Sequence, residues 1–229
     1  MQISDSSVRT VRKQTCDEQC IRTSKKRTCD LEYTSTIRDF PLMFQEMKKT
    51  AILLCEGRTT KEILRLSIDD NIYQLDKEKR RRSMPLKMTK RLSTLKMPLI
   101  KALADGWAGE GRLIAFLAMM KAERIVFEYM HDVYADKSDN DEITDFDFMQ
   151  FADRLATNSD VVAKWKSDTL KEINTRLKSI LCDAGLAKRT KSGIIAQKPI
   201  VDSEFCSLLD VDDWKYVRAV LFHSLPQGG

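Results

Sequence analysis

The chain has 229 residues, of which 42% are hydrophobic and 32% charged, and its formal net charge is +5. This length suits one large domain or two small ones, and the few glycines (8) and prolines (5) argue against a many-turned β sandwich. The modest net charge points to no partner by itself, so the distribution of charge along the chain matters more.

Residues 1–36 are polar, rich in Ser, Thr, Lys and Arg, and without apolar periodicity, which predicts a basic, disordered arm. Beyond it the pattern predicts a mainly α-helical bundle, with an N-terminal helical region over 37–106 and a C-terminal one over 107–229. A first helix is expected from about Asp39 to Gly57, and a capping box of Thr59 with Glu62 opens a second one.

The next helix is expected to start at Ser83 and Pro85, directly after the basic run 79–82, and to continue until Pro98 kinks or ends it. A joint that contains Trp107 follows. The strongest helix is predicted over 112–135, where the apolar face is wide, and others are predicted over 145–156, 167–183 and 203–222. Between the last two, Lys191-Ser192-Gly193 is a turn signal that predicts one short β hairpin, made by 186–188 and 194–196.

Basic residues gather in two stretches. Ten Lys or Arg lie between Asp76 and Lys101 against two carboxylates, a local charge of about +8, and nine lie from Lys164 to Lys198 against three carboxylates. A helix held by the core on one side and basic on the other is typical of a recognition helix, so segments 59–70 and 85–97 predict a loose helix-turn-helix. The capped helix and basic hairpin of 164–201 predict a winged-helix-like segment.

We expect the cations of both stretches to converge on one exposed wall that binds double-stranded DNA, mostly through phosphates and with weak sequence preference. RNA binding and a protein scaffold with basic docking faces are the alternatives. The candidate nucleic-acid-binding residues are Lys79, Arg80, Arg81, Arg82, Lys87, Lys90, Arg91, Lys96, Lys171, Arg176, Lys178, Lys188, Arg189 and Lys191.

Loop 136–147 resembles a calcium-binding EF-hand loop, but Asp141 stands where the sharp turn needs glycine and Asp147 where glutamate is usual. An acidic loop with Thr144 capping the next helix is the favoured interpretation. Cys16, Cys20 and Cys29 have no fourth ligand nearby, so no metal site is predicted. No catalytic motif is present, and neither an enzyme activity nor a cofactor is expected.

The longest apolar run, Leu113–Met120, is far shorter than the roughly 20 residues that cross a bilayer. The N-terminus carries charges and no apolar stretch typical of a secretory signal. We therefore expect a cytoplasmic protein with no membrane partner.

Several stretches in a fixed order resemble the BrxA family of BREX phage-resistance systems, over roughly residues 40–210. They are Leu54-Cys-Glu-Gly57, Thr59-Thr-Lys-Glu-Ile63, Asp70-Asn-Ile-Tyr-Gln74, Thr89-Lys-Arg-Leu92, Phe151-Ala-Asp153, Trp165-Lys-Ser-Asp-Thr169, Leu181-Cys-Asp-Ala-Gly-Leu186 and Pro199-Ile-Val201. The resemblance implies a small helical DNA-binding accessory protein that works beside a methyltransferase and other BREX components. It also implies a helical body similar to the RNA-binding antitermination factor NusB. Residues 1–36 lie outside the resemblance.

Overall fold

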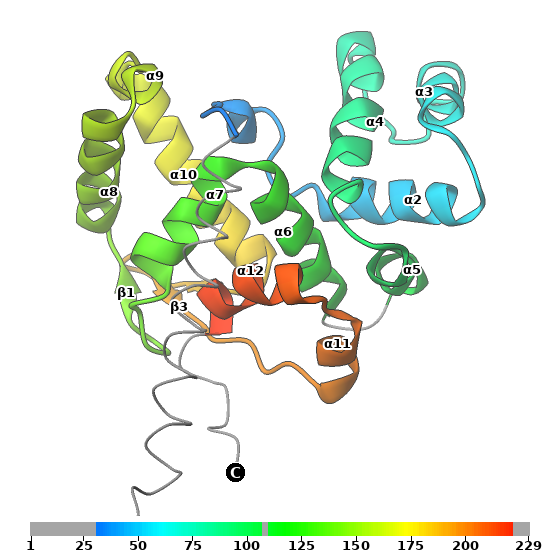
Figure 1. Cartoon of the computed structure of the whole chain (residues 1–229). Helices are drawn as coiled ribbons and strands as arrows, with labels where there is room; N and C mark the ends of the chain where they lie inside the picture. The colour runs from blue at the N-terminus through cyan, green and yellow to red at the C-terminus, as the bar shows by residue number, and fades with distance from the viewer. Residues whose placement is uncertain (1–30, 107–109, 222–229) are drawn as a thin grey trace, which may run out of the picture.

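A computed structural model describes residues 31–106 and 110–221, and it confirms the expected mainly helical fold (Figure 1). Residues 1–30 of the predicted arm, with Cys16, Cys20 and Cys29, lie outside the described residues, as does Trp107. The helices are η1 (Thr36–Arg38, 3₁₀), α2 (Phe44–Cys55), α3 (Thr60–Asp69), α4 (Glu78–Leu92), α5 (Met97–Asp105), α6 (Glu110–Ala122), α7 (Arg124–Tyr129), η2 (Met130–Tyr134, π), α8 (Asp145–Asn158), α9 (Asp160–Ala163), α10 (Ser167–Asp183), α11 (Ser203–Leu208) and α12 (Val211–Leu221).

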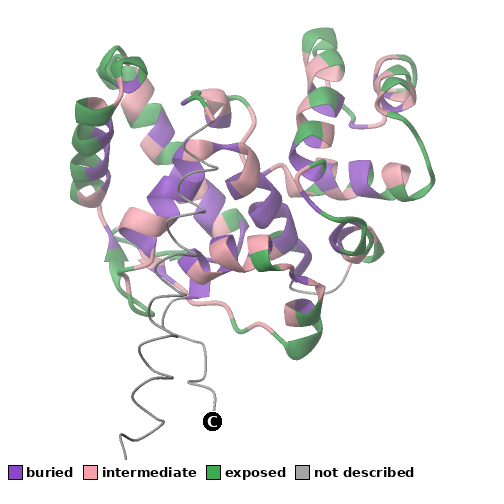
Figure 2. Ribbon diagram, in the orientation of Figure 1, coloured by how far each residue is buried: buried purple, intermediate pink, exposed green. Residues whose placement is uncertain are grey.

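Helix α6 lies at the centre of the fold. Residues 114–120 are all buried, and a helix that is apolar all round belongs inside a protein. It contacts α2, α4 and α5 on one side and α7 and α12 on the other, so one continuous core runs from Tyr33 to Leu221. The buried surfaces of the surrounding helices face this centre (Figure 2).

A small antiparallel sheet closes the C-terminal half. Its strands are β1 (Glu142–Ile143), β2 (Ala187–Arg189) and β3 (Ile194–Ala196), in the order β1-β3-β2. The predicted hairpin is β2–β3, with Arg189 opposite Ile194, and it is confirmed. Strand β1 was not predicted, because two residues are too short for a periodic signal; Ile143 pairs with Ile194 from the other side.

Three of the predicted helices have wrong limits. Helix α4 starts at Glu78 and keeps Pro85 inside it, and the chain turns over 93–96 before α5. Pro98 therefore starts a helix rather than ending one, in the first turn, where its missing amide hydrogen costs nothing. The helix expected over 112–135 breaks at Glu123, whose backbone is extended, and the one expected over 203–222 breaks at Leu209.

The end of the predicted arm is ordered. Tyr33 is buried, and its hydroxyl donates a 2.6 Å hydrogen bond to Glu128 on α7, while the Arg124 guanidinium lies 4.0 Å from its ring centre. Residues 31–36 are thus part of the packed body. The polar composition gave no sign of this packing, because the side chains that hold these residues are carboxylates about 90 residues further along the chain.

Candidate nucleic-acid interface

Helix α10 and the β2–β3 hairpin carry the most exposed group of cations. Ile173, Leu177 and Ile180 hold the helix to the core, and Gly185, at a φ of +77°, lets the chain leave the helix towards β2. The hairpin turn is closed by the Thr190 amide, which donates to the Gly193 carbonyl at 2.8 Å. Lys188, Arg189 and Lys191, in β2 and at the turn, are exposed.

The cations of this group are mostly free. Within the described residues no carboxylate lies in ion-pair range of the exposed side chains of Lys164, Lys166, Arg176, Lys188, Arg189 and Lys191. Lys171 has only a loose 3.9 Å contact with the exposed Asp168. Lys164 and Lys166 belong to the basic stretch but not to the candidate residues, and they extend the group to the start of α10. We use the name α10–hairpin surface for the seven residues Lys164, Lys166, Lys171, Arg176, Lys188, Arg189 and Lys191.

Lys178 does not belong to that free set. Its ammonium lies 2.8 Å from the Asp145 carboxylate at the start of α8, and its side chain is only 20% exposed. The hydrogen bonds from Lys178 and Asn174 hold the pKa of Asp145 below its usual value. The pairing joins residues 33 positions apart, so the sequence did not reveal it.

The first basic stretch contains a buried arginine. Arg91 is fully buried, and its guanidinium donates to the carbonyls of Phe40 and Pro41 at 2.5 and 2.6 Å. Lys87 is 14% exposed and lies 2.5 Å from the buried Glu123 carboxylate. Both side chains hold the core together, so the prediction that they face phosphates is corrected.

The basic run at the start of α4 is also largely engaged. Arg80 donates to the Asp39 carbonyl, Arg81 donates to the Leu75 carbonyl, and Arg82 pairs with Glu78 at 2.6 Å. Only Lys79 and Lys90, among the candidates of this stretch, are exposed without an ion pair.

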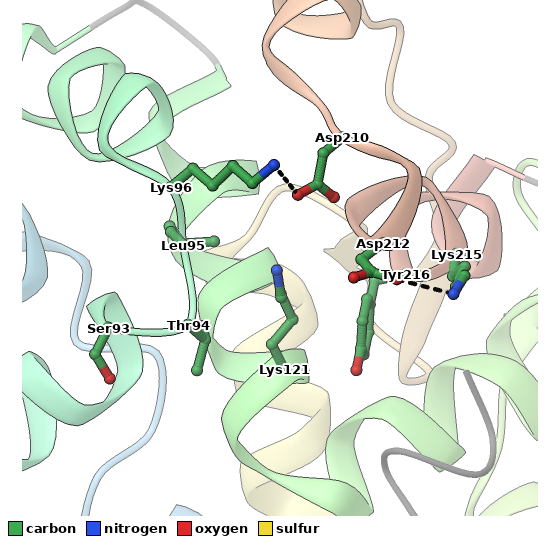
Figure 3. Close-up of a pocket in the computed structure, with 9 residues that line it drawn as sticks. All are labelled: Ser93, Thr94, Leu95, Lys96, Lys121, Asp210, Asp212, Lys215 and Tyr216. Atoms are coloured by element: carbon green, nitrogen blue, oxygen red, sulfur yellow. Dashed lines mark hydrogen bonds and ion pairs between the residues drawn. The ribbon is translucent and has the colours of Figure 1, made fainter. Parts of the chain in front are cut away.

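Lys96 closes one edge of a pocket of about 380 Å³ between the α4–α5 turn and the start of α12 (Figure 3). Its ammonium lies 2.8 Å from Asp210. Partial burial raises the pKa of Asp210, but the hydrogen bonds from Lys96 and the Asp213 amide outweigh it and lower the pKa to about 2. Lys96, although its side chain is 65% exposed, is therefore engaged by a carboxylate and is not one of the free cations.

The two basic stretches do not meet on one wall. Helix α4 packs against α2, α3 and α6, whereas α10 packs against η1, α8 and β2. Helix α6 lies between them in Figure 1. The expectation of a single converging surface is therefore corrected to two separate groups, of which the α10–hairpin surface is the larger.

Several carboxylates of the acidic loop 136–147 are already engaged by other groups of the protein. Both oxygens of Asp147 lie 2.9 Å from the Lys137 ammonium, and Thr144 and Asp147 form a capping box at the start of α8. The expected capping role of Thr144 is confirmed. The described part of the chain has no cluster of three or more His, Cys, Asp or Glu arranged to hold a metal ion.

Across the two described ranges, none of the helices combines the length and the apolarity that a membrane crossing requires.

Comparison with known proteins gives consistent matches. The family model described as BrxA matches residues 31–212. A relative from Bacillus cereus (strain H3081.97), described as "BREX protein BrxA", is 32% identical over 190 residues, which cover 82% of this chain and 91% of the relative. The crystal structure of an uncharacterized protein from Magnetospirillum magneticum has the same fold, with a TM-score of 0.70 at 20% identity, covering 83% of this chain and 98% of that one.

Proposed function

The chain belongs to the BrxA family, and from that premise we propose that it is a non-catalytic, double-stranded DNA-binding accessory protein of a BREX phage-defence system. The observation that carries the proposal is the set of unpaired, exposed cations on the α10–hairpin surface. Other BREX components are its proposed protein partners.

The order of elements supports a winged-helix arrangement for this segment. Strand β1, helices α8, α9 and α10, and the β2–β3 hairpin follow one another, and the sheet order β1-β3-β2 returns the hairpin beside β1. In such a unit α10 would enter the major groove, and Lys188, Arg189 and Lys191 would reach the phosphates beside it. Lys79 and Lys90 on α4 form a secondary, separate contribution.

A salt titration of duplex binding tests this function. Each phosphate neutralised by a cation releases counterions, so log K falls with log salt by about 0.9 per contact. We expect a steep slope for the native protein. The triple variant Lys188→Glu, Arg189→Glu, Lys191→Glu should lose at least about three phosphate contacts and bind far more weakly.

A matched triple variant controls for the change in net charge. Lys61→Glu, Arg65→Glu and Lys101→Glu reverse three exposed cations on α3 and α5, away from the proposed surface. Equal losses in the two triple variants would contradict a defined α10–hairpin interface. Preference for structured RNA over duplex DNA at the same salt would favour the RNA-binding alternative, and no nucleic-acid affinity at physiological salt would favour a scaffold.

A further inference from the structure

Two large apolar side chains stand exposed near the start of α8. Phe146 is 63% exposed and Met149 is 59% exposed, and residues three apart on a helix are surface neighbours. The outer side of α8 is drawn as exposed in Figure 2. Neighbouring exposed apolar side chains of this size mark a contact surface more often than isolated ones do.

The exposed pair lies near the end of α8 that contacts α10 and follows β1, the strand paired with the hairpin. Asp145, the residue before Phe146, accepts hydrogen bonds from Asn174 and Lys178 of α10 at 2.6 and 2.8 Å. On the other side, Ile143 pairs with Ile194, the first residue of β3 after the hairpin turn. Figure 1 shows β1 and β3 together at the foot of α8, with α10 alongside. The start of α8 is thus bounded by α10 and the hairpin.

The two carboxylates that flank Phe146 in the sequence are already engaged by cations. Asp145 is engaged by Lys178 and Asn174, and Asp147 is engaged by Lys137 and by the Thr144 amide. Phosphates that approach the free cations of α10 and the hairpin therefore face no unpaired charge at these two positions, whereas the exposed Glu142 beside the hairpin turn has no ion pair among the described residues.

We propose that Phe146 and Met149 contact the same DNA duplex as the α10–hairpin surface, by packing against deoxyribose and thymine methyl groups; the inference rests on the function proposed above. Apolar side chains make such contacts with the thymine methyl group in specific complexes. The pair would add affinity that does not depend on salt, because no counterion is released when apolar surface is buried.

The double variant Phe146→Ser, Met149→Ser tests this, with Leu86→Ser, Met97→Ser as the matched control. Leu86 and Met97 are 51% and 49% exposed and lie on α4 and α5. Duplex affinity is measured for both variants and the native protein over a series of salt concentrations. The α8 variant should bind on the order of tenfold more weakly at every salt concentration, with an unchanged slope, while the control should match the native protein.

The possible results distinguish a failure of the proposed contact by Phe146 and Met149 from a failure of DNA binding as a whole. If the α8 variant binds duplex as the native protein does, while the hairpin triple variant loses binding, the apolar pair has another role and the inference is wrong. If the native protein binds no duplex, the function itself fails. A Phe146→Trp variant gives a second readout that does not depend on weakening the fold. The fluorescence of the added tryptophan should be quenched by duplex DNA, and unchanged fluorescence would count against the contact.

Discussion

At the residue scale, whether a cationic side chain is free depends on the groups that surround it in the fold. Arg91 and Lys90 are adjacent in sequence, yet one is fully buried and the other exposed without an ion pair. Burial lowers the pKa of Arg91 to about 10, which still leaves it charged at neutral pH, so its charge has to be balanced inside the protein. The carbonyls of Phe40 and Pro41 and the carboxylate of Glu123, 3.6 Å away, provide that balance.

We therefore expect Arg91→Met to be strongly destabilising. The change leaves Glu123 buried with Lys87 as its remaining cation, and loss of one partner from a buried charge group costs about 3–5 kcal/mol. Urea unfolding measures the difference, with Lys90→Met as the control, for which the change should stay within about 0.5 kcal/mol. Similar stabilities for the two variants would contradict the structural role of Arg91.

At the scale of the element, α4 is a helix with a proline inside it. Pro85 has no amide hydrogen, so the carbonyl of Arg81 loses its usual donor within the helix. The hydroxyl of Ser67, fully buried on α3, donates to this carbonyl at 2.6 Å. This contact from a neighbouring helix explains why α4 continues through Pro85, where the sequence pattern predicts that the helix begins.

Because Ser67 donates to the carbonyl that Pro85 leaves without a donor, we expect mutations at these two positions to have coupled effects on stability. Ser67→Ala should cost about 1–3 kcal/mol, because the Arg81 carbonyl is left unsatisfied. In Ser67→Ala, Pro85→Ala the loss should be smaller, because the new amide at position 85 can donate to that carbonyl. A double-mutant cycle from urea unfolding measures the coupling, and additive effects would show that the serine and the proline act independently.

At the scale of the whole molecule, the basic residues are divided between two places. The α10–hairpin surface and the free cations of α4 belong to elements that contact different neighbours. Their effects on DNA binding should therefore be independent, since distant sites without shared partners usually add.

We expect Lys79→Glu, Lys90→Glu to weaken duplex binding less than Lys188→Glu, Lys191→Glu, although the change in net charge is the same. The four-residue variant should show the sum of both effects on log K. A titration of duplex affinity at one fixed salt concentration measures this. A larger effect from the α4 pair, or a clear departure from the sum, would make α4 part of the main interface.

The sequence by itself determined the helical class, the capping box at Thr59, the cap at Thr144, helix 167–183 and the hairpin, because these depend on residues a few positions apart. The basic stretches were also visible in it. Only the tertiary structure decided which cations remain free, since the partners of Lys87, Lys96 and Lys178 are Glu123, Asp210 and Asp145, between 33 and 114 positions away along the chain. Charge pairing across such separations follows from the packing of the helices, and no local pattern encodes it.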